Sequence, residues 1–396
     1  MIMKTVIRPE TEMKDSGIEW IGNIPNDWKV SRVGNFFSFS SGDSLTNEDI
    51  RDDGMYLVYG ANGIRGYYFK YNLDKKRILL GRVGALAGNV HIVDEKVWVT
   101  EHALIASDKL NLVEEYYGYV FESMNLIQYS KSSAQPVISG DTLQKLRFPV
   151  PELSEQQSIA DYLDETCSKI DEIIAEAKAS INEYKELKIA IIDDFTICGL
   201  NKTKLKYISK KIGDGLHGTP QYSNNGTVAF INGTNIGDEK ITIKSNTNFV
   251  SVDEAEKYKN ELNSQTILIS LNGTIGNSSL YDGENIILGK SAGYITLKNN
   301  VCREYVRYCL FNSETKETFD LSLKGTTISN LSLNTLRNTD ICLPDFKIQV
   351  ETAKRIKDKL AEIDSLIAEK ESLINDLEAY KKSLIYEVVT GKRRVV

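Results

Sequence analysis

The chain contains nearly the same helical segment twice, and this repeat limits the possible folds more than any other feature. "KIDEIIAEAKASINEYKEL" begins at Lys169, and "EIDSLIAEKESLINDLEAY" begins at Glu362. A shift of 193 residues superimposes the two segments, for example Ile170 on Ile363. Because an internal repeat usually reflects a repeated structural unit, the two segments predict two equivalent long helices.

The repeat extends upstream of both helical segments. "VISGDTLQKL" from Val137 parallels "TISNLSLNTL" from Thr327. Further upstream, "LLGRVGALAGNV" from Leu79 loosely parallels "LISLNGTIGNSS" from Leu268. The 396 residues therefore divide into two halves, each with a globular part followed by a long helix.

Apolar residues in both helical segments recur at alternating spacings of four and three, the seam of a coiled coil. The first seam comprises Leu163, Cys167, Ile170, Ile174, Ala177, Ile181, Tyr184, Lys188 and Ile191. The second comprises Ile356, Leu360, Ile363, Ile367, Lys370, Ile374, Leu377, Lys381, Leu384 and Val388. Roughly 40 helical residues span about 60 Å. An alternative is two independent helices, each packed on its own domain.

Charge favours pairing of the two helices with each other. Residues 151–199 hold four basic and twelve acidic side chains, a balance of −8. Residues 346–396 hold eleven and nine, a balance of +2. Proline precedes both segments, in "FPVPELSEQQ" and "CLPDFKIQVE", and Ser154 with Gln157 predicts a capping box at the first start.

The globular parts predict strand-rich mixed α/β domains, because short apolar runs such as "RILLGRVG" and "QTILISLNG" are bounded by Gly and Asn. The predicted fold class is α+β. Two such domains lie at opposite ends of a long antiparallel two-helix coiled coil, related by an internal pseudo-two-fold repeat. The predicted segments are 1–29, an N-terminal segment; 30–150, domain 1; 151–199, helix 1; 200–345, domain 2; and 346–396, helix 2.

Composition predicts a soluble, cytoplasmic protein. The charged fraction is 26% and the net charge is −7, with the excess acid in the first helix, so both domains are close to neutral and could each present a basic face. No apolar run is long enough for a membrane helix, and the N-terminus lacks a signal-peptide core. Five dispersed cysteines without CxxC spacing predict reduced thiols.

No catalytic constellation emerges from the residues. The three histidines, His91, His102 and His217, are far apart, and no metal-ligand spacing occurs. "GENIILGKS" from Gly283 has five residues between its glycines where a phosphate-binding loop needs four.

Several motifs, in order along the whole chain, resemble the DNA-specificity subunit of type I restriction–modification systems. They are "KDSGIEWIGNIPNDWKV" from Lys14, "YGANGIRGYY" from Tyr59, "WVTEHALI" from Trp98, "FPVPELSEQQSIADYLDETCSKIDEII" from Phe148 and "DGLHGTPQY" from Asp214. The second helix start, "LPDFKIQVETAKRI", lacks the family's usual Pro-Leu-x-Glu-Gln pattern.

The resemblance implies a non-catalytic subunit that binds double-stranded DNA. Each target-recognition domain would read one half of a bipartite, asymmetric target, and the coiled coil would set the spacing between the halves. Two modification subunits would dock on the helices and carry S-adenosylmethionine. Restriction subunits would join through them and carry ATP and Mg²⁺. The resemblance implies no cofactor in this chain and no membrane partner. Two alternatives to a DNA-specificity subunit stay open: a self-contained enzyme acting on DNA, and a coiled-coil scaffold that binds only protein.

Candidate DNA contacts are side chains able to reach base edges or phosphates near the glycine-rich turns. In domain 1 they are Arg65, Tyr67, Lys70, Arg82, Lys131, Ser133 and Gln135. In domain 2 they are Asn272, Thr274, Lys290, Lys324 and Thr326. Alternatively, the glycine motifs are structural turns and the tyrosines belong to the core. His217 and Thr219 could contact DNA or cap a turn, and we favour the turn.

Overall fold

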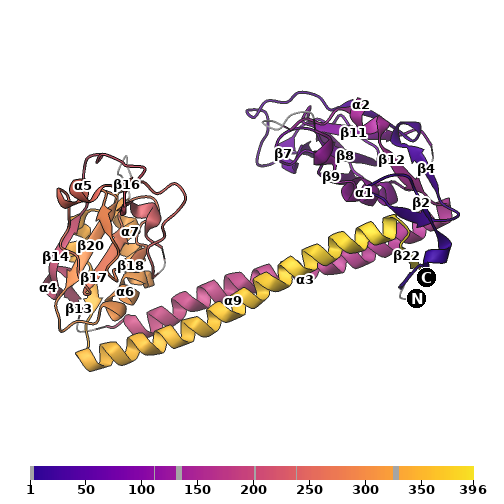
Figure 1. The fold of residues 1–396 in the computed structure, drawn as a ribbon. Helices are drawn as coiled ribbons and strands as arrows, with labels where there is room; N and C mark the ends of the chain where they lie inside the picture. Colours follow the sequence, from indigo (N-terminus) through magenta and orange to yellow (C-terminus); the bar gives the residue numbers. More distant parts are fainter. Residues whose placement is uncertain (1–3, 111, 131–135, 200–201, 238, 324–329) are drawn as a thin grey trace. The chain divides into compact units, whose positions relative to one another are not determined.

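The computed structural model describes residues 4–110, 112–130, 136–199, 202–237, 239–323 and 330–396 (Figure 1). The chain divides into two compact units. Unit 1 consists of Met1–Ala177 with Ser372–Val396, and unit 2 of Lys178–Glu371. Each unit therefore combines a globular head with part of both long helices, α3 (Leu153–Thr196) and α9 (Phe346–Val389).

Unit 1 contains head 1, residues 29–150, and the two chain ends. Its helices besides α3 and α9 are α1 (Glu114–Ser123) and α2 (Gly140–Lys145). Its strands are β1 (Thr5–Ile7), β2 (Met13–Asp15), β3 (Asn23–Pro25), β4 (Lys29–Arg32), β5 (Phe37–Ser41), β6 (Tyr56–Gly60), β7 (Gly63–Tyr68), β8 (Arg77–Gly81), β9 (Val90–Val93), β10 (Val97–Val99), β11 (Ala103–Asp108), β12 (Arg147–Val150) and β22 (Arg393–Val395).

Unit 2 contains head 2, residues 202–342. Its helices are α4 (Leu205–Ile208), α5 (Val252–Glu256), α6 (Arg303–Phe311), α7 (Ser313–Leu323) and α8 (Leu333–Asn338). Its strands are β13 (Lys202–Lys204), β14 (Ser209–Asp214), β15 (Val228–Ile231), β16 (Phe249–Val250), β17 (Thr266–Ser270), β18 (Ser278–Leu280), β19 (Ile286–Leu288), β20 (Ala292–Leu297) and β21 (Asp340–Cys342).

The two heads share one topology, strand for strand. Head 1 has an antiparallel sheet in the order β5-β11-β8-β9, and head 2 has the equivalent order β14-β20-β17-β18. A second sheet pairs β6 with parallel β10 and antiparallel β7, as β15 pairs with parallel β19 and antiparallel β16. The predicted fold class of two repeated mixed α/β heads on two long helices is confirmed.

Alternation along the central strand of head 2 explains its layers. Ile267 and Ile269 pack in the cluster that contains α6, whereas Leu268 packs with residues of β15 and β19. Successive side chains of a strand point to opposite faces. The four-stranded sheet is therefore buried on both faces, which is why "TILIS" reads as a continuous apolar run.

The segments that lead into the long helices are equivalent in detail. α2 and α8 have the same length and are shifted by 193 residues. Ser139 Oγ accepts the Thr142 N–H at 3.2 Å, and Ser332 Oγ accepts the Thr335 N–H at 3.0 Å. An N-cap serine satisfies a backbone donor that a helix start leaves free.

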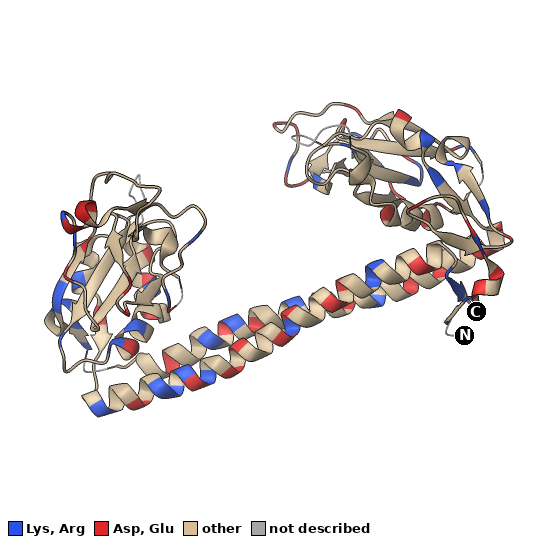
Figure 2. Cartoon of the chain, in the orientation of Figure 1, with Lys and Arg blue, Asp and Glu red and all other residues tan. Residues whose placement is uncertain are grey.

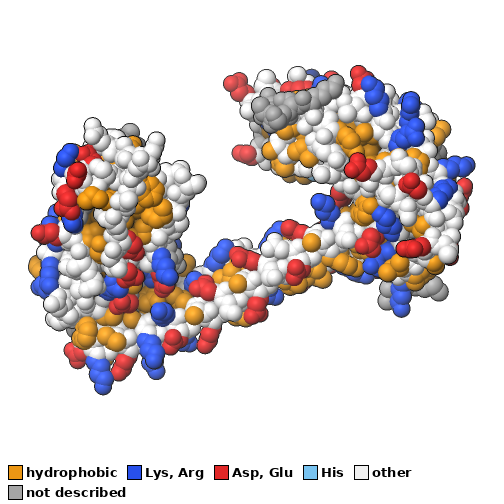
Figure 3. Space-filling view, in the orientation of Figure 1, with side chains coloured by type: hydrophobic (Ala, Val, Ile, Leu, Met, Phe, Trp, Pro, Cys, Tyr) orange, Lys and Arg blue, Asp and Glu red, His pale blue; other side chains and the backbone are white. Residues whose placement is uncertain are grey.

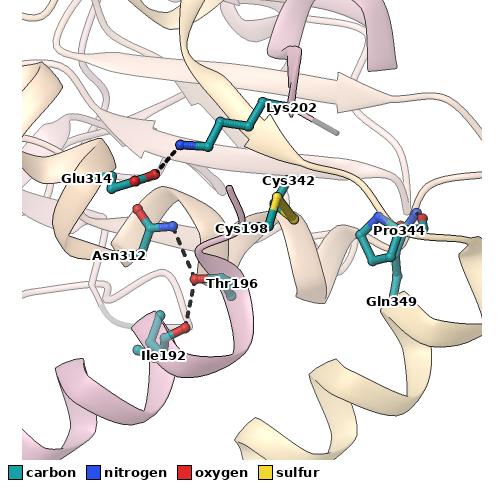
Figure 4. Close-up of a disulfide and its surroundings, with 9 residues drawn as sticks. All are labelled: Ile192, Thr196, Cys198, Lys202, Asn312, Glu314, Cys342, Pro344 and Gln349. Atoms are coloured by element: carbon teal, nitrogen blue, oxygen red, sulfur yellow. Dashed lines mark hydrogen bonds and ion pairs between the residues drawn. A yellow bond between two sulfur atoms is a disulfide. The ribbon is translucent and has the colours of Figure 1, made fainter. Parts of the chain in front are cut away.

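Both long helices begin with the same side-chain contact. Gln156 Nε2 donates to the Pro151 carbonyl at 3.0 Å, and Gln349 Nε2 donates to the Pro344 carbonyl at 2.7 Å (Figure 4). Gln349 Oε1 also accepts the Cys302 N–H at 2.9 Å. The second start thus keeps the glutamine that fixes the first, although its sequence departs from the family pattern.

The predicted capping box at Ser154 and Gln157 is wrong. α3 begins at Leu153, so Ser154 already lies inside the helix, and its carbonyl accepts from Ser158 Oγ. Gln157 points along the helix and donates to Asp161. A capping residue precedes the first helical residue, so an N-cap at Ser154 would require a helix that begins at Glu155, two residues later than the observed start.

The predicted seam is confirmed, because every seam residue is buried or half-buried and the nonpolar ones form the helix–helix core. Two ion pairs cross it: Lys188–Asp364 at 2.7 Å in unit 2 and Lys381–Asp171 at 2.7 Å in unit 1. A shift of 193 residues converts one pair into the other, so the two units repeat this contact. Charged residues are spread along both helices (Figure 2).

The segments near the two ends of the chain pair with each other in unit 1. β1 pairs antiparallel with β22, and the Val396 N–H donates to the Lys4 carbonyl at 2.8 Å. Buried Trp28 donates its indole N–H to Glu155 at 2.8 Å, and Arg8 forms an ion pair with the same carboxylate. The N-terminal segment therefore fastens the start of α3 and the end of α9 to one another.

A disulfide joins Cys198 and Cys342 in unit 2 (Figure 4), so the prediction of reduced cysteines is wrong for this pair. The two residues are 144 apart in sequence, but the end of α3 and strand β21 bring their Cα atoms to 5.9 Å. Such a distance suits a disulfide. Spacing along the chain could not reveal this contact, because the whole of head 2 lies between the cysteines. Cys167, Cys302 and Cys309 are free and buried.

Among the described residues, no helix is both long enough and apolar enough to cross a membrane.

Candidate nucleic-acid interface

Several strands of head 2 end at one edge, which we call the loop edge of head 2: residues 214–217, 231–233, 270–274 and 288–291. β14 and β17 both end there and β20 begins there, since Asp214 and Ile269 both pair with Gly293. Ser291 links three of the segments. It accepts from the Gly233 N–H at 3.0 Å, donates to Asn232 at 3.1 Å, and its carbonyl accepts from the Leu271 N–H at 2.9 Å.

The equivalent edge of head 1 consists of residues 41–43, 60–65, 81–84 and 100–102, and we call it the loop edge of head 1. The Arg82 N–H donates to the His102 carbonyl at 2.9 Å, and the Thr100 N–H donates to the Tyr59 carbonyl at 2.9 Å. The Asp43 N–H, just after β5, donates to the Val99 carbonyl of β10 at 3.0 Å, and this bond connects the four-stranded and three-stranded sheets at the same end. Each head therefore presents one cluster of turns built on rigid strands.

A glycine in each head allows the closest backbone approach at this edge. A Cβ atom on Gly42 would lie 2.2 Å from the Val99 carbonyl oxygen, and one on Gly215 would lie 2.1 Å from the Leu288 carbonyl oxygen. No side chain fits at such distances. Packing therefore requires Gly215 in "DGLHGTP", and Gly42, which follows β5, is its counterpart in head 1.

Asn272, Thr274 and Lys290, predicted as DNA contacts, all lie at the loop edge of head 2. Lys290 is exposed in the turn between β19 and β20. Thr274 Oγ1 lies 3.4 Å from the Gly233 carbonyl, so its hydroxyl also braces the turns. Asn272 is half-buried, and its backbone bridges to Asn330. Lys290 is the most available of the three for an outside ligand.

Arg65 and Arg82 lie at the loop edge of head 1. Val58 pairs with Gly66 and Tyr59 with Ile64, so Arg65 is the extra residue of a β-bulge. Bulges redirect a side chain away from regular alternation. Arg65 is exposed and donates to Asn47 at 2.6 Å.

Arg82 is held more firmly than Arg65. Its Nη1 donates to Ser41 Oγ at 2.6 Å, while its buried Nε has no hydrogen-bond partner among the described residues. The Ser41 bond fixes the guanidinium over the end of β5. Over the part of the chain that the structure describes, no carboxylate forms an ion pair with this guanidinium.

Tyr67 and Lys70 lie away from the loop edge of head 1. β7 starts at the edge with Gly63, which pairs with Gly60, and runs away from it toward Tyr68. Tyr67 is half-buried and pairs with Leu57 and Arg51, whereas Lys70 is exposed beyond the strand. The structure thus does not bring these two residues to the other candidates.

The remaining candidates lie outside the described residues. They are Lys131, Ser133, Gln135, Lys324 and Thr326. The described residues that follow these segments occupy equivalent places. Val137 bridges to Val83 in head 1, and Asn330 bridges to Asn272 in head 2.

Sequence reasoning missed several polar residues that the strands place at the loop edges. Asn62 accepts from Asn89 at 3.0 Å in head 1, and Asn232 accepts from Ser291 in head 2. His102 is exposed beside Arg82. A polar residue directly after a short apolar run was the available signal for Asn232, which follows "VAFI". Two residues separate each of Asn62 and His102 from such a run, so the signal for them was weaker.

His217 forms a local pair, which fits the turn interpretation. Its Nε2 lies 2.7 Å from Asp214, three residues earlier, and its side chain is exposed. Leu216 bridges to Gly289, which fixes this turn beside Lys290. The pair can stabilise the turn and still face an outside ligand.

Titration and metal binding contribute little at these edges. Burial lowers the pKa of His91, beside Gly63, so its imidazole is neutral at neutral pH. Burial, and then the charge of Glu95, raises the pKa of Tyr59, which stays protonated. Over the described residues, His, Cys, Asp and Glu form no group that could hold a metal ion. The arrangement is that of a binding surface with cationic and amide side chains.

A family model described as the type I restriction modification DNA specificity domain matches residues 25–183 and 201–376. The two matched segments correspond to the two halves of the internal repeat. Each runs from the first strand of a head into the long helix that follows it.

Among curated proteins, the chain is similar to specificity subunits. It is 24% identical over 413 residues to the type I restriction enzyme MjaVIII specificity subunit of Methanocaldococcus jannaschii, covering 94% of each chain. It is 33% identical over 140 residues to the EcoprrI specificity subunit of Escherichia coli. That second match spans about a third of each protein, 34% of this chain and 35% of the relative.

Solved structures show the same fold. A chain from a study of complex assembly and conformational transition in the type I R-M system matches with a TM-score of 0.71 at 12% identity, covering 93% of this chain and 99% of that one. The HsdS subunit of Thermoanaerobacter tengcongensis matches with a TM-score of 0.50 at 13% identity, covering 93% and 98%. With its family model matched over most of its length, the chain belongs to the family of type I restriction modification DNA specificity proteins and carries that domain twice.

Proposed function

We propose that the chain reads a bipartite DNA target, with one loop edge contacting each half. The observation that carries this proposal is that two heads of one topology present different side chains at equivalent positions. Arg82 of head 1 corresponds to the buried Leu271 of head 2, and Val83 corresponds to the half-buried Asn272. One scaffold with two chemistries suits two different half-sites, and so an asymmetric target.

Each loop edge combines the two kinds of group that DNA recognition needs. Arg65, Arg82 and Lys290 can grip phosphates or make hydrogen bonds to guanine, while Asn62, Asn232 and Asn272 can reach adenine edges or phosphates. The rigid strands behind the turns hold these groups in place. A site built on strands positions its side chains better than one built on long loops.

The paired helices would set the spacing between the two half-sites. α3 and α9 are continuous over 44 residues each, and their seam is repeated in both units. A helix of this length spans about 66 Å. A stiff pair of helices would therefore fix an unread spacer, because neither head could move independently of the seam.

The helices would also dock two copies of one partner, the modification subunit. Apolar side chains are visible on the surface of the helix pair (Figure 3). Ile173 and Tyr380 are exposed in unit 1, and Leu366 and Leu187 are exposed at the equivalent positions of unit 2. Repeated exposed apolar residues suit two identical partners, since exposed apolar patches mark interaction sites.

In this proposal, this chain recognises the DNA target, and its partner subunits catalyse methylation and restriction. Modification subunits would carry S-adenosylmethionine, and restriction subunits, joined through them, would carry ATP and Mg²⁺. The assembly would act in the cytoplasm, where it meets genomic DNA.

Methylome sequencing of the host, with and without the gene for this chain, tests the proposal. The expected result is the loss of one bipartite methylation motif on deletion and its return when the gene is restored. A control strain carries a gene truncated within α3. An unchanged set of methylated motifs in the deletion strain would exclude the proposed function.

A further inference from the structure

A hollow on the flank of head 2 is lined by basic side chains and by no carboxylate. Its lining consists of Lys206, Ser209, Lys210, Lys211, Ile212 and Arg337. Lys206 belongs to α4, Lys210 and Lys211 to β14, and Arg337 to α8. Figure 2 shows basic residues gathered over α4 and β14. We call this site the basic hollow.

A β-bulge brings the two consecutive lysines to the same hollow. Ser209 pairs with Leu297 and Lys211 with Thr296, so Lys210 is an extra residue in β14. Regular alternation would place neighbouring side chains on opposite faces of the strand. The bulge breaks this alternation, and both lysines line the hollow.

Most cations of the hollow donate hydrogen bonds to uncharged oxygen atoms. Lys206 donates to Asn338 at 2.9 Å, Lys210 donates to Asn299 at 2.6 Å, and Arg337 donates to the Ile212 carbonyl at 3.2 Å. Lys211 lies 3.4 Å from Glu261, a carboxylate whose side chain is 89% exposed. The charge of at least three cations is therefore not neutralised by a carboxylate among the described residues.

Three other lysines of head 2 form ion pairs with carboxylates and serve as a comparison. Lys202 pairs with Glu314 at 2.7 Å, Lys204 with Asp340 at 2.8 Å, and Lys259 with Glu256 at 2.7 Å. A lysine beside a carboxylate contributes little net field. Unlike these three lysines, the cations of the hollow keep a charge that is available to an outside anion.

Head 1 lacks this feature. The positions of head 1 that correspond to Lys206, Lys211 and Arg337 are occupied by the uncharged residues Gly34, Ser38 and Gln144. The bulge residue Lys210 has no counterpart in head 1, because β5 pairs with β11 without a bulge. The hollow is therefore not required by the shared topology of the heads, because head 1 forms the same strands without it.

The hollow lies within reach of a duplex that contacts the loop edge of head 2. β14 leads from Lys211 to Asp214 at the edge, three residues and about 10 Å away. That distance equals about three base pairs along a DNA axis. Arg337 lies beside this part of β14, because it donates a hydrogen bond to the carbonyl of Ile212, the residue after Lys211.

We infer that the basic hollow grips the phosphate backbone of duplex DNA beside the half-site contacted by head 2. This inference rests on the proposed function and assigns to head 2 a sequence-independent grip that head 1 does not have. Phosphates need only positive charge and donors, which the three side chains that lack carboxylate partners supply. Tyr207, exposed beside Lys206, adds an apolar wall next to these charges.

The test compares two triple variants of the full chain. Lys206→Gln, Lys210→Gln and Arg337→Gln remove the cations of the hollow. Lys202→Gln, Lys204→Gln and Lys259→Gln remove the same charge from residues that already have carboxylate partners. Affinity for a duplex of arbitrary sequence is measured between about 50 and 200 mM salt, the range in which phosphate contacts dominate binding.

The hollow variant should bind on the order of 10²-fold more weakly near 0.1 M salt, and its salt slope should fall by about two to three units. The control variant should change both quantities far less. Circular dichroism and a denaturation midpoint close to wild type establish that each variant is folded. Equal behaviour of the two variants would overturn the inference.

Three further outcomes are decisive. A hollow variant that binds DNA like wild type but no longer assembles with the modification subunits would make the hollow a protein-docking face, which also overturns the inference. If the wild-type assembly does not prefer its methylated motif over arbitrary duplex, the proposed function itself fails. If wild type shows that preference and the hollow variant retains the same salt slope, only the inference about the hollow fails.

Discussion

A matched insertion of seven residues in both long helices should shift methylation to a target whose spacer is about three base pairs longer. The insertion duplicates residues 171–177 after Ala177 and residues 368–374 after Ile374. These points face each other, since the pairs Lys188–Asp364 and Lys381–Asp171 fix the antiparallel register. Seven residues lengthen a helix by about 10 Å and preserve the repeat of the seam.

The half-site bases should stay unchanged, because no loop edge is altered. Three base pairs also rotate DNA by almost a third of its turn of 10–10.5 base pairs, so methylation of the new target should be slower. The control inserts seven residues into α3 alone, which breaks the pairing and should abolish methylation. Methylation of the original spacer by the matched variant would mean that the helices do not set the distance.

Ile363→Asp should lower the stability of unit 2 by at least about 3 kcal/mol. Ile363 is only 5% exposed in the seam, and the substitution removes its apolar contacts and buries an unpaired carboxylate. The measurement is the denaturant midpoint of the purified chain, followed by circular dichroism. The in vivo consequence should be loss of the methylation motif.

Leu366→Asp is the matched control, three residues further along the same helix. Leu366 is 40% exposed, so its substitution should cost less than about 1 kcal/mol. Since Leu366 belongs to the exposed apolar set proposed to dock partners, this variant should fold normally and bind modification subunits more weakly. Equal destabilisation by both variants would contradict the assignment of Ile363 to the helix–helix core.

The long helices could be predicted from the sequence because periodicity is a local signal. Alternating spacings of four and three residues identified the buried face of α3 and α9, and the 193-residue shift related them. Lys188 and Lys381 also fall in the seam, and periodicity alone does not explain why charged residues lie there. The structure supplies one, since each lysine reaches an aspartate on the facing helix.

The contacts between distant segments could not be predicted. The disulfide depends on the closure of head 2, and the bulge at Arg65 depends on how β7 pairs with β6. Tyr67 and Lys70 were grouped with Arg65 by proximity in sequence. A strand, however, carries successive residues away from an edge at about 3.3 Å each. Candidates chosen from one strand therefore separate in space, whereas turns from several strands converge.

The most direct test of the account is whether each loop edge controls one half of the target. Methylome sequencing is applied to strains that carry Arg65→Ala in head 1 or Lys290→Ala in head 2. Both side chains are exposed, so both variants should fold. We expect each variant to relax or weaken base preference in one half of the bipartite motif, and the two variants to affect different halves. Changes in the same half, or in both halves equally, would contradict the assignment of one half-site to each head.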